Sequence, residues 1–256
     1  TQDGTYLYDN LPGYEYVNVQ YDTYRYFRKH PNDAGDKIRC GYKICRYVQF
    51  PDGESAIMPQ ILKKLLKARK DTRKMIPTET DEFMKQILEQ RQNGYKVTAN
   101  SLYGGCGAKT SSFYEKDIAA CTTAIGRKLL TYGKRIIEEC YGNNICETTL
   151  YGKVRTRAEY IYGDTDSVFY TFNLEDLDGN PIRGKQAVEI TIQLAQQAGH
   201  IAAAFLKAPH DFEYEKTFMP FCLLSKKRYV GMLYETNPNK CKRKEMGIVL
   251  KRRDNA

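Results

Sequence analysis

Two acidic residues separated by one position, Asp164 and Asp166, form the pattern in this sequence that points most directly to chemistry. They lie in the stretch IYGDTDSVFY, where apolar and β-branched residues flank the acids. These flanks predict two short strands, Glu159–Tyr162 and Val168–Phe172, joined by a tight turn at Gly163–Ser167. Such a turn holds both carboxylates at the tip of a hairpin, where their mutual repulsion favours a bound cation.

Hard carboxylate oxygens at a hairpin tip suit Mg²⁺ or Mn²⁺ better than Zn²⁺. The plainer alternative is a turn in which Asp164 hydrogen-bonds its own backbone, as aspartates in turns commonly do. An EF-hand calcium loop fits poorly, because strands rather than helices flank the acids. The two acids therefore need support from the rest of the chain.

Composition favours a polyanionic partner. The 256 residues carry a formal charge of +9, and the cations gather at Lys63–Lys74, Lys226–Arg228 and Lys240–Arg253. Clustered cations are typical of a surface that binds nucleic acid. The chain has 21 tyrosines and no tryptophan, and tyrosines suit surfaces that stack on bases.

The eight cysteines indicate reduced thiols. No C-x-x-C pair occurs, so neither a zinc site nor a disulfide framework is predicted, and a reducing compartment is favoured. No apolar run is long enough to span a bilayer and no signal peptide is visible, so no membrane partner is expected. Because the chain begins with Thr1 and ends within a basic run, we expect an internal piece of a longer polypeptide.

A first helix is predicted over Ile57–Met75. It has an apolar stripe at helical spacing, formed by Ile61, Leu62, Leu65 and Leu66. Arg69 lies one turn beyond Leu65 and Arg73 one turn beyond Arg69, so two cations continue the line. A plain core helix would keep that line apolar. The alternative is that solvated cations near a helix C-terminus are favoured by the helix dipole.

A second helix is predicted to open at Thr78, with Asp81 in its first turn, and to run toward Tyr103. Near its end, Lys96, Asn100 and Tyr103 are spaced at i, i+4 and i+7 and therefore share one face. A cation, an amide and a phenol on one face are unusual for core packing, although a solvated face remains an alternative.

Further elements are predicted around these motifs. Long amphipathic patterns predict two more helices, and alternating patterns predict strands in the N-terminal region and around a basic turn near the C-terminus. The helices are Asp117–Tyr141 and Val188–Leu206, and the strand-forming segments are Tyr14–Val19, Tyr42–Phe50 and Phe212–Tyr234.

Taken together, these motifs resemble those of family B DNA polymerases. The stretch YGDTDS resembles motif C of that family, KVTANSLYGG resembles motif B, LLKARKDTRK resembles the first fingers helix, and SKKRY resembles the primer-gripping motif. They occur in the order of the family, and the resemblance covers nearly the whole chain from Ile57 onward. It is strongest to delta-type polymerases and to those of large DNA viruses.

The resemblance implies roles for single residues. Asp164 and Asp166 would hold two catalytic Mg²⁺ ions, with Mn²⁺ as an alternative. The nucleotide-binding residues would be Arg69, Arg73 and Lys96 on the triphosphate, with Asn100 and Tyr103 around the nascent base pair. The DNA-binding residues would be Gly104 beside the template, Lys226, Lys227, Arg228 and Tyr229 at the primer end, and Lys251, Arg252 and Arg253 along the primer–template backbone.

The resemblance also implies an architecture. The expected class is α+β, with an antiparallel palm sheet backed by helices and a fingers subdomain that projects as a helical hairpin. We expect residues 1–56 to be an N-terminal part of the palm, 57–104 the fingers, 105–238 the remaining palm, and 239–256 the start of the thumb.

The implied reaction is DNA-templated DNA synthesis, in which the primer 3′-hydroxyl attacks a dNTP by two-metal nucleotidyl transfer. The family's motif A, which carries another essential aspartate, has no match here and should lie upstream of Thr1. We therefore expect this chain by itself to be inactive. Implied partners are primer–template DNA, dNTPs and a sliding clamp or other processivity factor, in the nucleus or at a cytoplasmic viral replication site.

Two other readings stay open. A non-catalytic, DNA-binding relative could retain this fold, although intact Asp164 and Asp166 argue against it. An RNA-templated or RNA-synthesising palm enzyme is the second alternative, which the N-S-x-Y-G form of motif B disfavours.

Overall fold

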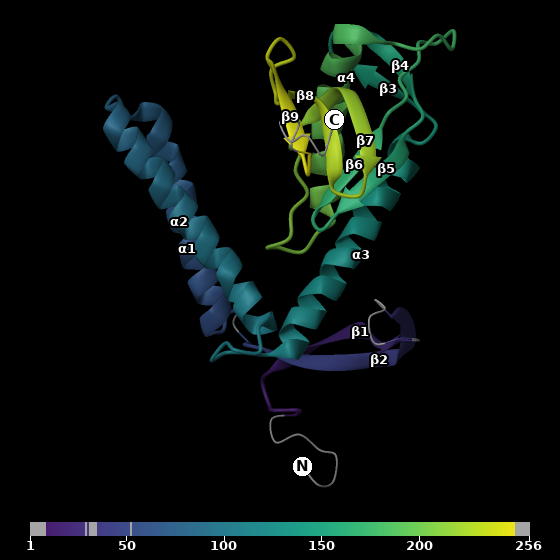
Figure 1. Ribbon diagram of the computed structural model, residues 1–256. Helices are drawn as coiled ribbons and strands as arrows, with labels where there is room; N and C mark the ends of the chain where they lie inside the picture. The colour runs from purple at the N-terminus through teal and green to yellow at the C-terminus, as the bar shows by residue number, and fades with distance from the viewer. Residues whose placement is uncertain (1–8, 29, 31–34, 52, 249–256) are drawn as a thin grey trace. The chain divides into compact units, whose positions relative to one another are not determined.

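The computed structural model describes residues 9–28, 30, 35–51 and 53–248. The chain divides into two compact units, residues 1–125 and 126–256. One continuous helix, α3 (Lys116–Tyr141), runs across the boundary between them (Figure 1). Among the described helices, none has the length and apolar character needed to cross a bilayer.

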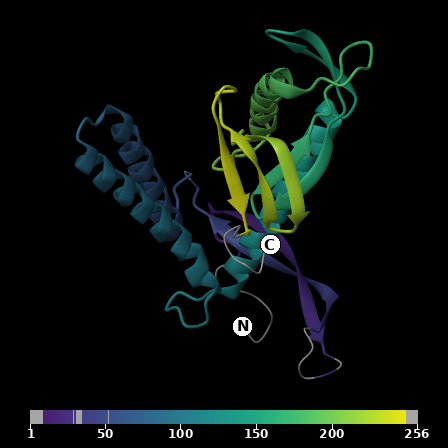
Figure 2. The ribbon, with the colours of Figure 1, turned by 45° about the horizontal axis from the view of Figure 1, so that its top comes forward.

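The first unit contains a long two-stranded ribbon, which Figures 1 and 2 show from two sides. Its strands, β1 (Glu15–Phe27) and β2 (Asp36–Gln49), pair antiparallel along their whole length, with a bulge near Thr23. Strands were predicted in both places, but they extend well beyond the predicted ends. Aromatic and β-branched residues recur as far as Phe27, and such residues favour strands.

The same unit contains a helical hairpin of α1 (Ile57–Met75) and α2 (Glu82–Gly107), joined through the 3₁₀ turn η1 (Ile76–Thr78). The bounds predicted for α1 are confirmed. The predicted start of α2 at Thr78 is wrong, because Thr78 belongs to η1 and Asp81 is the N-cap. The Asp81 carboxylate accepts a hydrogen bond from the Phe83 N–H at 2.9 Å, which satisfies a free donor of the first turn.

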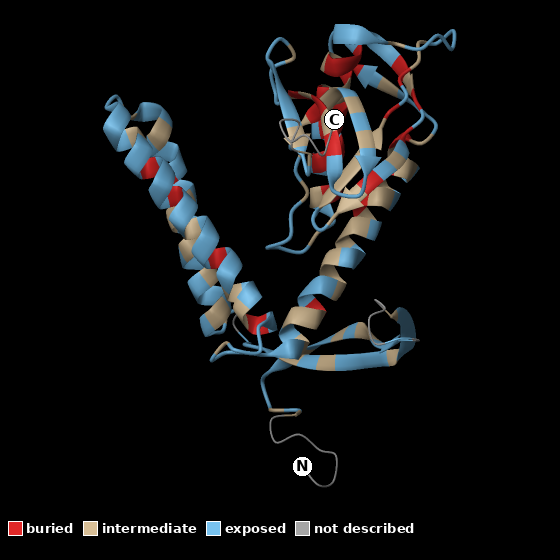
Figure 3. Ribbon diagram, viewed as in Figure 1, coloured by how far each residue is buried: buried red, intermediate tan, exposed pale blue. Residues whose placement is uncertain are grey.

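The core of the second unit lies around α4 (Gly184–Ala204), which buries nine of its residues. The C-terminal half of α3 and the hairpin of β3 (Asn144–Thr148) and β4 (Gly152–Thr156) supply further core residues. Figure 3 shows that buried residues concentrate in this unit. The core cluster comprises Ile137, Tyr141, Val154, Ala158, Phe172, Leu174, Ala187, Ile190, Leu194, Ala195 and Ala198.

The remaining strands form two antiparallel sheets from consecutive strands. One is the hairpin β5 (Glu159–Asp164) with β6 (Ser167–Thr171), and the other has the order β7 (Thr217–Ser225), β8 (Arg228–Tyr234), β9 (Cys241–Met246). Helices combined with small antiparallel sheets are compatible with the α+β class. Within the described residues the strands form four separate sheets, instead of the single palm sheet that was expected.

Candidate active site

The two acids lie at the tip of the β5–β6 hairpin. Asp164 ends β5 and pairs with Ser167, so only Thr165 and Asp166 form the turn, which is shorter than predicted. Thr165 has a φ of 52°, a left-handed conformation that costs a β-branched residue about 1–2 kcal/mol. The Asp166 N–H donates to the Asp164 carbonyl at 2.6 Å, which closes the turn.

A second tight turn, between β7 and β8, meets this tip. The ammonium Nζ of Lys227 lies 2.5 Å from Asp164 Oδ1. The backbone N–H of Lys227 also donates to the hydroxyl of Tyr162 at 2.9 Å. Lys227 itself is left-handed, with a φ of 63°. The acidic motif and the basic KKRY motif, which were predicted separately, therefore form one structure.

The two acids differ in their electrostatic surroundings. The hydrogen bond from Lys227 holds the pKa of Asp164 below its usual value, and the same contact raises the pKa of Lys227. Asp166 is exposed, and the described part of the chain offers it no ion-pair partner. Asp164 thus has its charge balanced within the protein, whereas the carboxylate of Asp166 is available to a cation.

Stacked aromatic rings hold the two turns together. Phe169 of β6 lies 5.7 Å from Phe221, 6.2 Å from Phe218 and 5.5 Å from Tyr229, measured between ring centroids. Tyr162, on the neighbouring strand, contacts Phe169 at 5.6 Å. Tyr229 of the KKRY motif is 7% exposed, so its ring packs inside this cluster and fixes the start of β8.

A groove of about 830 Å³ runs along β6. It is bounded by β6, by α4 and by residues 211–221, and Asp166 lies among its lining residues. Two further acids, Glu213 and Glu215, line the same groove. In the described part of the chain, β6 pairs only with β5, and all of its residues line this groove.

The chemistry of the acids fits a hard divalent cation, but the set is incomplete. Within the described residues, no group of three or more His, Cys, Asp or Glu side chains gathers in a way that could hold a metal. Mg²⁺ is commonly bound by one or two carboxylates plus water and substrate phosphates. Asp166, with Asp164 beside it, therefore fits part of such a site.

The predicted nucleotide-binding residues lie on the α1–α2 hairpin of the first unit. Arg69 Nε donates to Gln92 Oε1 across the hairpin at 3.3 Å, and Lys96 follows Gln92 by one helical turn. Arg73, Lys96 and Asn100 are exposed on the hairpin surface. The contact between Arg69 and Gln92 thus brings Arg69 near the turn of α2 that carries Lys96.

Tyr103 is tied to the start of α3. Its hydroxyl and the Thr123 Oγ1 are 2.9 Å apart, and either can donate. Gly105 is needed nearby, because a Cβ there would lie 2.3 Å from the Phe113 ring. A Cβ at Gly104 would meet nothing within 4 Å. Sequence reasoning did not find Thr123, since no local motif marks a partner 20 residues away.

The other predicted DNA-binding residues divide into two groups. Lys226 and Arg228 are exposed on either side of Lys227. Lys251, Arg252 and Arg253 lie outside the described residues, so their predicted role has no structural counterpart.

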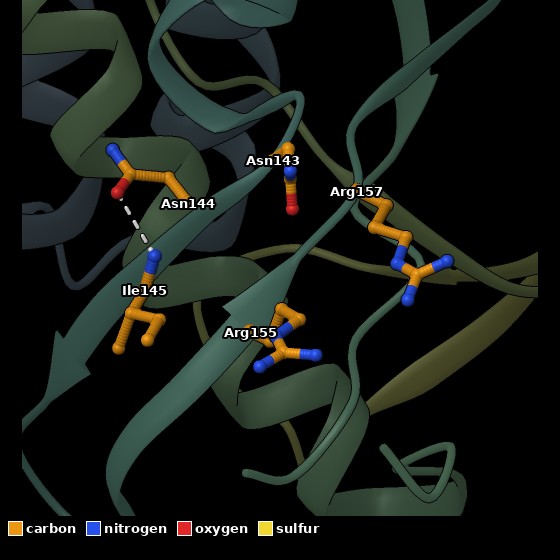
Figure 4. A pocket seen from close by; sticks show the side chains of 5 residues that line it. All are labelled: Asn143, Asn144, Ile145, Arg155 and Arg157. Atoms are coloured by element: carbon orange, nitrogen blue, oxygen red, sulfur yellow. Dashed lines mark hydrogen bonds between the residues drawn. The ribbon is translucent and has the colours of Figure 1, made fainter.

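A separate hollow of about 840 Å³ lies on the β3–β4 hairpin (Figure 4). The side chains of Asn143, Arg155 and Arg157 surround it. Arg157 is already paired with Glu175, at 3.1 Å. The residues that line it include no acid, so this hollow is not a carboxylate site for a metal.

Comparison with known proteins identifies the relatives of this sequence. The model of the family "DNA polymerase family B" matches residues 14–256. A DNA polymerase of Phaeocystis pouchetii virus is 56% identical over 220 residues, which are 86% of this chain and 21% of the relative. A DNA polymerase of Pyramimonas orientalis virus is 41% identical over 294 aligned positions, covering 97% of this chain and 22% of the relative.

A cellular protein is also similar. The DNA polymerase delta catalytic subunit of Oryza sativa subsp. japonica is 37% identical over 207 residues, which are 80% of this chain and 17% of the relative. The chain therefore spans about a fifth of the length of the curated relatives that it matches.

Proposed function

Because the chain belongs to DNA polymerase family B, we propose that it forms the palm and fingers part of a DNA-directed DNA polymerase. The activity is that of the longer protein, since the chain spans only about a fifth of its relatives. The observation that carries the proposal is the meeting of the acidic turn with the basic β7–β8 turn through Lys227 and Asp164.

In this proposal Asp166 is the first ligand of two Mg²⁺ ions, with Mn²⁺ as an alternative, and Asp164 lies beside it. Bound divalent ions would activate the primer hydroxyl and stabilise the attacking and leaving oxygens. Asp166 supplies the negative charge that holds them. Lys227 lowers the pKa of Asp164 and joins that carboxylate to the turn that would receive the primer.

The cations of the α1–α2 hairpin bind the incoming dNTP. Arg69 and Arg73 present planar guanidinium groups that can bind phosphate oxygens in pairs, and Lys96 adds a point charge. Asn100 and Tyr103 shape the space around the nascent base pair. Thr123 is a positioning residue, because it orients the Tyr103 phenol without needing to touch the nucleotide.

The KKRY turn holds the primer. Lys226 and Arg228 are exposed and suited to phosphate contacts, which fix position without reading sequence. Tyr229 supports this turn from within the aromatic cluster. Gly104, which has open space around its Cα, leaves room for the template, and the basic run at Lys251–Arg253 follows the duplex backbone.

Primer–template DNA and dNTPs are the substrates, and a sliding clamp or other processivity factor would bind the longer protein. The site of action would be the nucleus or a cytoplasmic viral replication site. We propose that residues 1–256 by themselves do not extend a primer, because motif A is missing.

The test is made in the longer protein. Asp166→Asn should reduce primer extension by about 10³-fold or more while leaving primer–template affinity within about twofold. Asp178→Asn, which changes an exposed acid of the same unit, is the matched control and should retain activity. Normal extension by the Asp166→Asn protein would refute the assignment.

The nucleotide assignment has its own test. Arg69→Ala and Lys96→Ala should each raise the KM for dNTP by about tenfold or more, because each removes a charge-assisted phosphate contact. Lys70→Ala, an exposed cation on the same helix, is the control. Wild-type dNTP kinetics in both variants would show that this hairpin does not bind the triphosphate.

Two alternatives are separated by the same assays. A non-catalytic DNA-binding relative would bind primer–template DNA but extend it with neither dNTPs nor rNTPs. An RNA-synthesising palm enzyme would prefer rNTPs over dNTPs.

A further inference from the structure

The β1–β2 ribbon has two faces of different character. Successive side chains of a strand alternate between faces, and residues paired across strands share a face. One face is turned to α3, where the Tyr21 hydroxyl donates to Asp117 and the ammonium of Lys43 contacts the same carboxylate. We call the opposite side the outer face; it comprises Tyr16, Asn18, Gln20, Asp22, Tyr24 and Tyr26 of β1 and Lys37, Arg39, Tyr42, Ile44, Arg46 and Val48 of β2.

Cations and aromatic rings interleave on the outer face. The Lys37 ammonium lies 4.0 Å from the centroid of the Tyr24 ring, and the Arg46 guanidinium lies 4.4 Å from that of Tyr16. Arg39 pairs with Asp22, at 2.8 Å. Arg46 pairs with Asp9, at 3.1 Å. Three cations and two acids leave a net positive charge at this face, so charge complementarity favours a polyanion.

The outer face also exposes aromatic surface. Tyr26 is 63% and Tyr42 59% exposed. Tyr42 pairs with Asp22 of β1, which is four positions from Tyr26. The two rings are therefore about 14 Å apart along the ribbon at the usual rise of a strand. Tyr24 lies between them. A row of aromatic rings with cations between them is the arrangement that binds single-stranded nucleic acid with little sequence preference.

We propose that the outer face of the β1–β2 ribbon binds single-stranded nucleic acid, with Tyr26 and Tyr42 stacking on bases and Lys37 and Arg39 neutralising phosphates. This surface is additional to the polymerase site proposed above and needs neither metal nor nucleotide. A single-stranded template is a strand that a polymerase must hold, which connects the two proposals without making one depend on the other.

The absence of tryptophan from the sequence allows a direct test. Tyr26→Trp places a single indole on the outer face, and Phe27→Trp places one on the opposite face of the same strand. These neighbouring residues are 63% and 62% exposed, so they form a matched pair. The tryptophan emission of each variant therefore reports on ligand bound to the face that carries the indole.

The 256-residue chain would be titrated with an oligo-dT strand at low salt. Stacking should quench the tryptophan emission of the Tyr26→Trp protein by about half and leave that of the Phe27→Trp protein nearly unchanged. A hairpin duplex of equal charge should quench neither. Equal quenching in both proteins, no quenching in the Tyr26→Trp protein, or equal quenching by the duplex would overturn the proposal.

Binding measurements with unlabelled variants give a second readout. Lys37→Gln should weaken oligo-dT binding and lower the slope of log affinity against log salt by about 0.7, the value for one lost phosphate contact on a single strand. Tyr26→Ala should weaken binding about fivefold or more. Arg25→Gln, on the opposite face, is the control, and an equal loss there would show a general charge effect and overturn the proposal.

Discussion

The ammonium of Lys227 lies 2.5 Å from Asp164 Oδ1, although 63 residues separate the two in sequence. The same residue anchors its backbone on the Tyr162 hydroxyl, so the β7–β8 turn is fixed to β5 at two points. Each turn contains a left-handed residue, Thr165 or Lys227. Such conformations persist only where surrounding contacts determine them, and they concentrate at functional sites.

Removing the ammonium should change the titration of Asp164. Lys227→Gln is expected to raise the pKa of Asp164 from its lowered value toward about 3.9, the value of an unpaired aspartate. Carboxylate NMR across pH 2–6 would measure it, and Lys226→Gln is the control for loss of one nearby charge. An equal rise in both variants would show that the ion pair is not the cause.

The pH dependence of this ion pair follows from the direction of that shift. The pKa of Asp164 is lower in the folded state than in the unfolded state, where it is about 3.9. The ion pair therefore stabilises the fold above about pH 3.9, and this stabilisation is lost as the pH falls through the folded pKa. Because the Lys227 side chain is 68% exposed and that of Asp164 is 34% exposed, solvent screens the pair and the effect on the unfolding free energy should be small.

The anchor of the ribbon on α3 should respond to alkali. Burial, together with the hydrogen bond to Asp117, raises the pKa of Tyr21 to about 12. The stability that depends on its neutral phenol is present below the unfolded pKa of about 10 and is lost as pH rises toward 12. Absorbance at 295 nm should show Tyr21 titrating after the exposed tyrosines.

Tyr21→Phe removes this hydrogen bond and should lower the free energy of unfolding by about 1 kcal/mol at pH 7. Tyr26→Phe, which changes a largely exposed tyrosine of the same strand, should alter it by less than about 0.5 kcal/mol. Urea unfolding would measure both variants. An equal change in unfolding free energy for the two variants would mean that the contact between Tyr21 and Asp117 does not stabilise the fold.

Much of the fold could be predicted, because its signals are local. The bounds of α1 and the extent of α3 follow from apolar spacing, and the hairpin at Asp164 follows from β-branched residues around a turn. The N-cap of α2 could not be placed, since Thr78 and Asp81 are both acceptable caps and only the 3₁₀ turn decides between them.

The Tyr103–Thr123 contact should behave as one interaction. Tyr103→Phe and Thr123→Val should each lower the unfolding free energy by about 0.5–1.5 kcal/mol, and the double variant should lose little more than either. Thermal or urea unfolding of the four proteins forms the cycle. Strictly additive losses would show that the hydroxyls do not act on each other.

Truncation in the core of the second unit should be severe. Leu194 is completely buried, so Leu194→Ala should lower the unfolding free energy by about 2–5 kcal/mol. Leu177 is 52% exposed, and Leu177→Ala should cost much less. Chemical denaturation compares the two, and similar losses would contradict the position of the core at α4.

The residues of the candidate site could be predicted one by one, but the contacts between them could not. Motif spacing picks out Asp164 and Asp166, yet only tertiary structure reveals that Lys227 neutralises the first and leaves the second open. The packing of Tyr229 against Phe169 was likewise hidden, because β6 and β8 are far apart in sequence. Long-range side-chain contacts carry no signal in a single sequence.

Every described sheet is built from strands that follow one another directly along the chain. Pairing between such neighbours requires only short loops to close, and proteins rich in local contacts fold quickly. During synthesis each hairpin can therefore form soon after its second strand leaves the ribosome, without waiting for distant segments. Strands β5 and β6 could therefore pair early, whereas the contacts that fix the acidic turn wait for Lys227 to be translated.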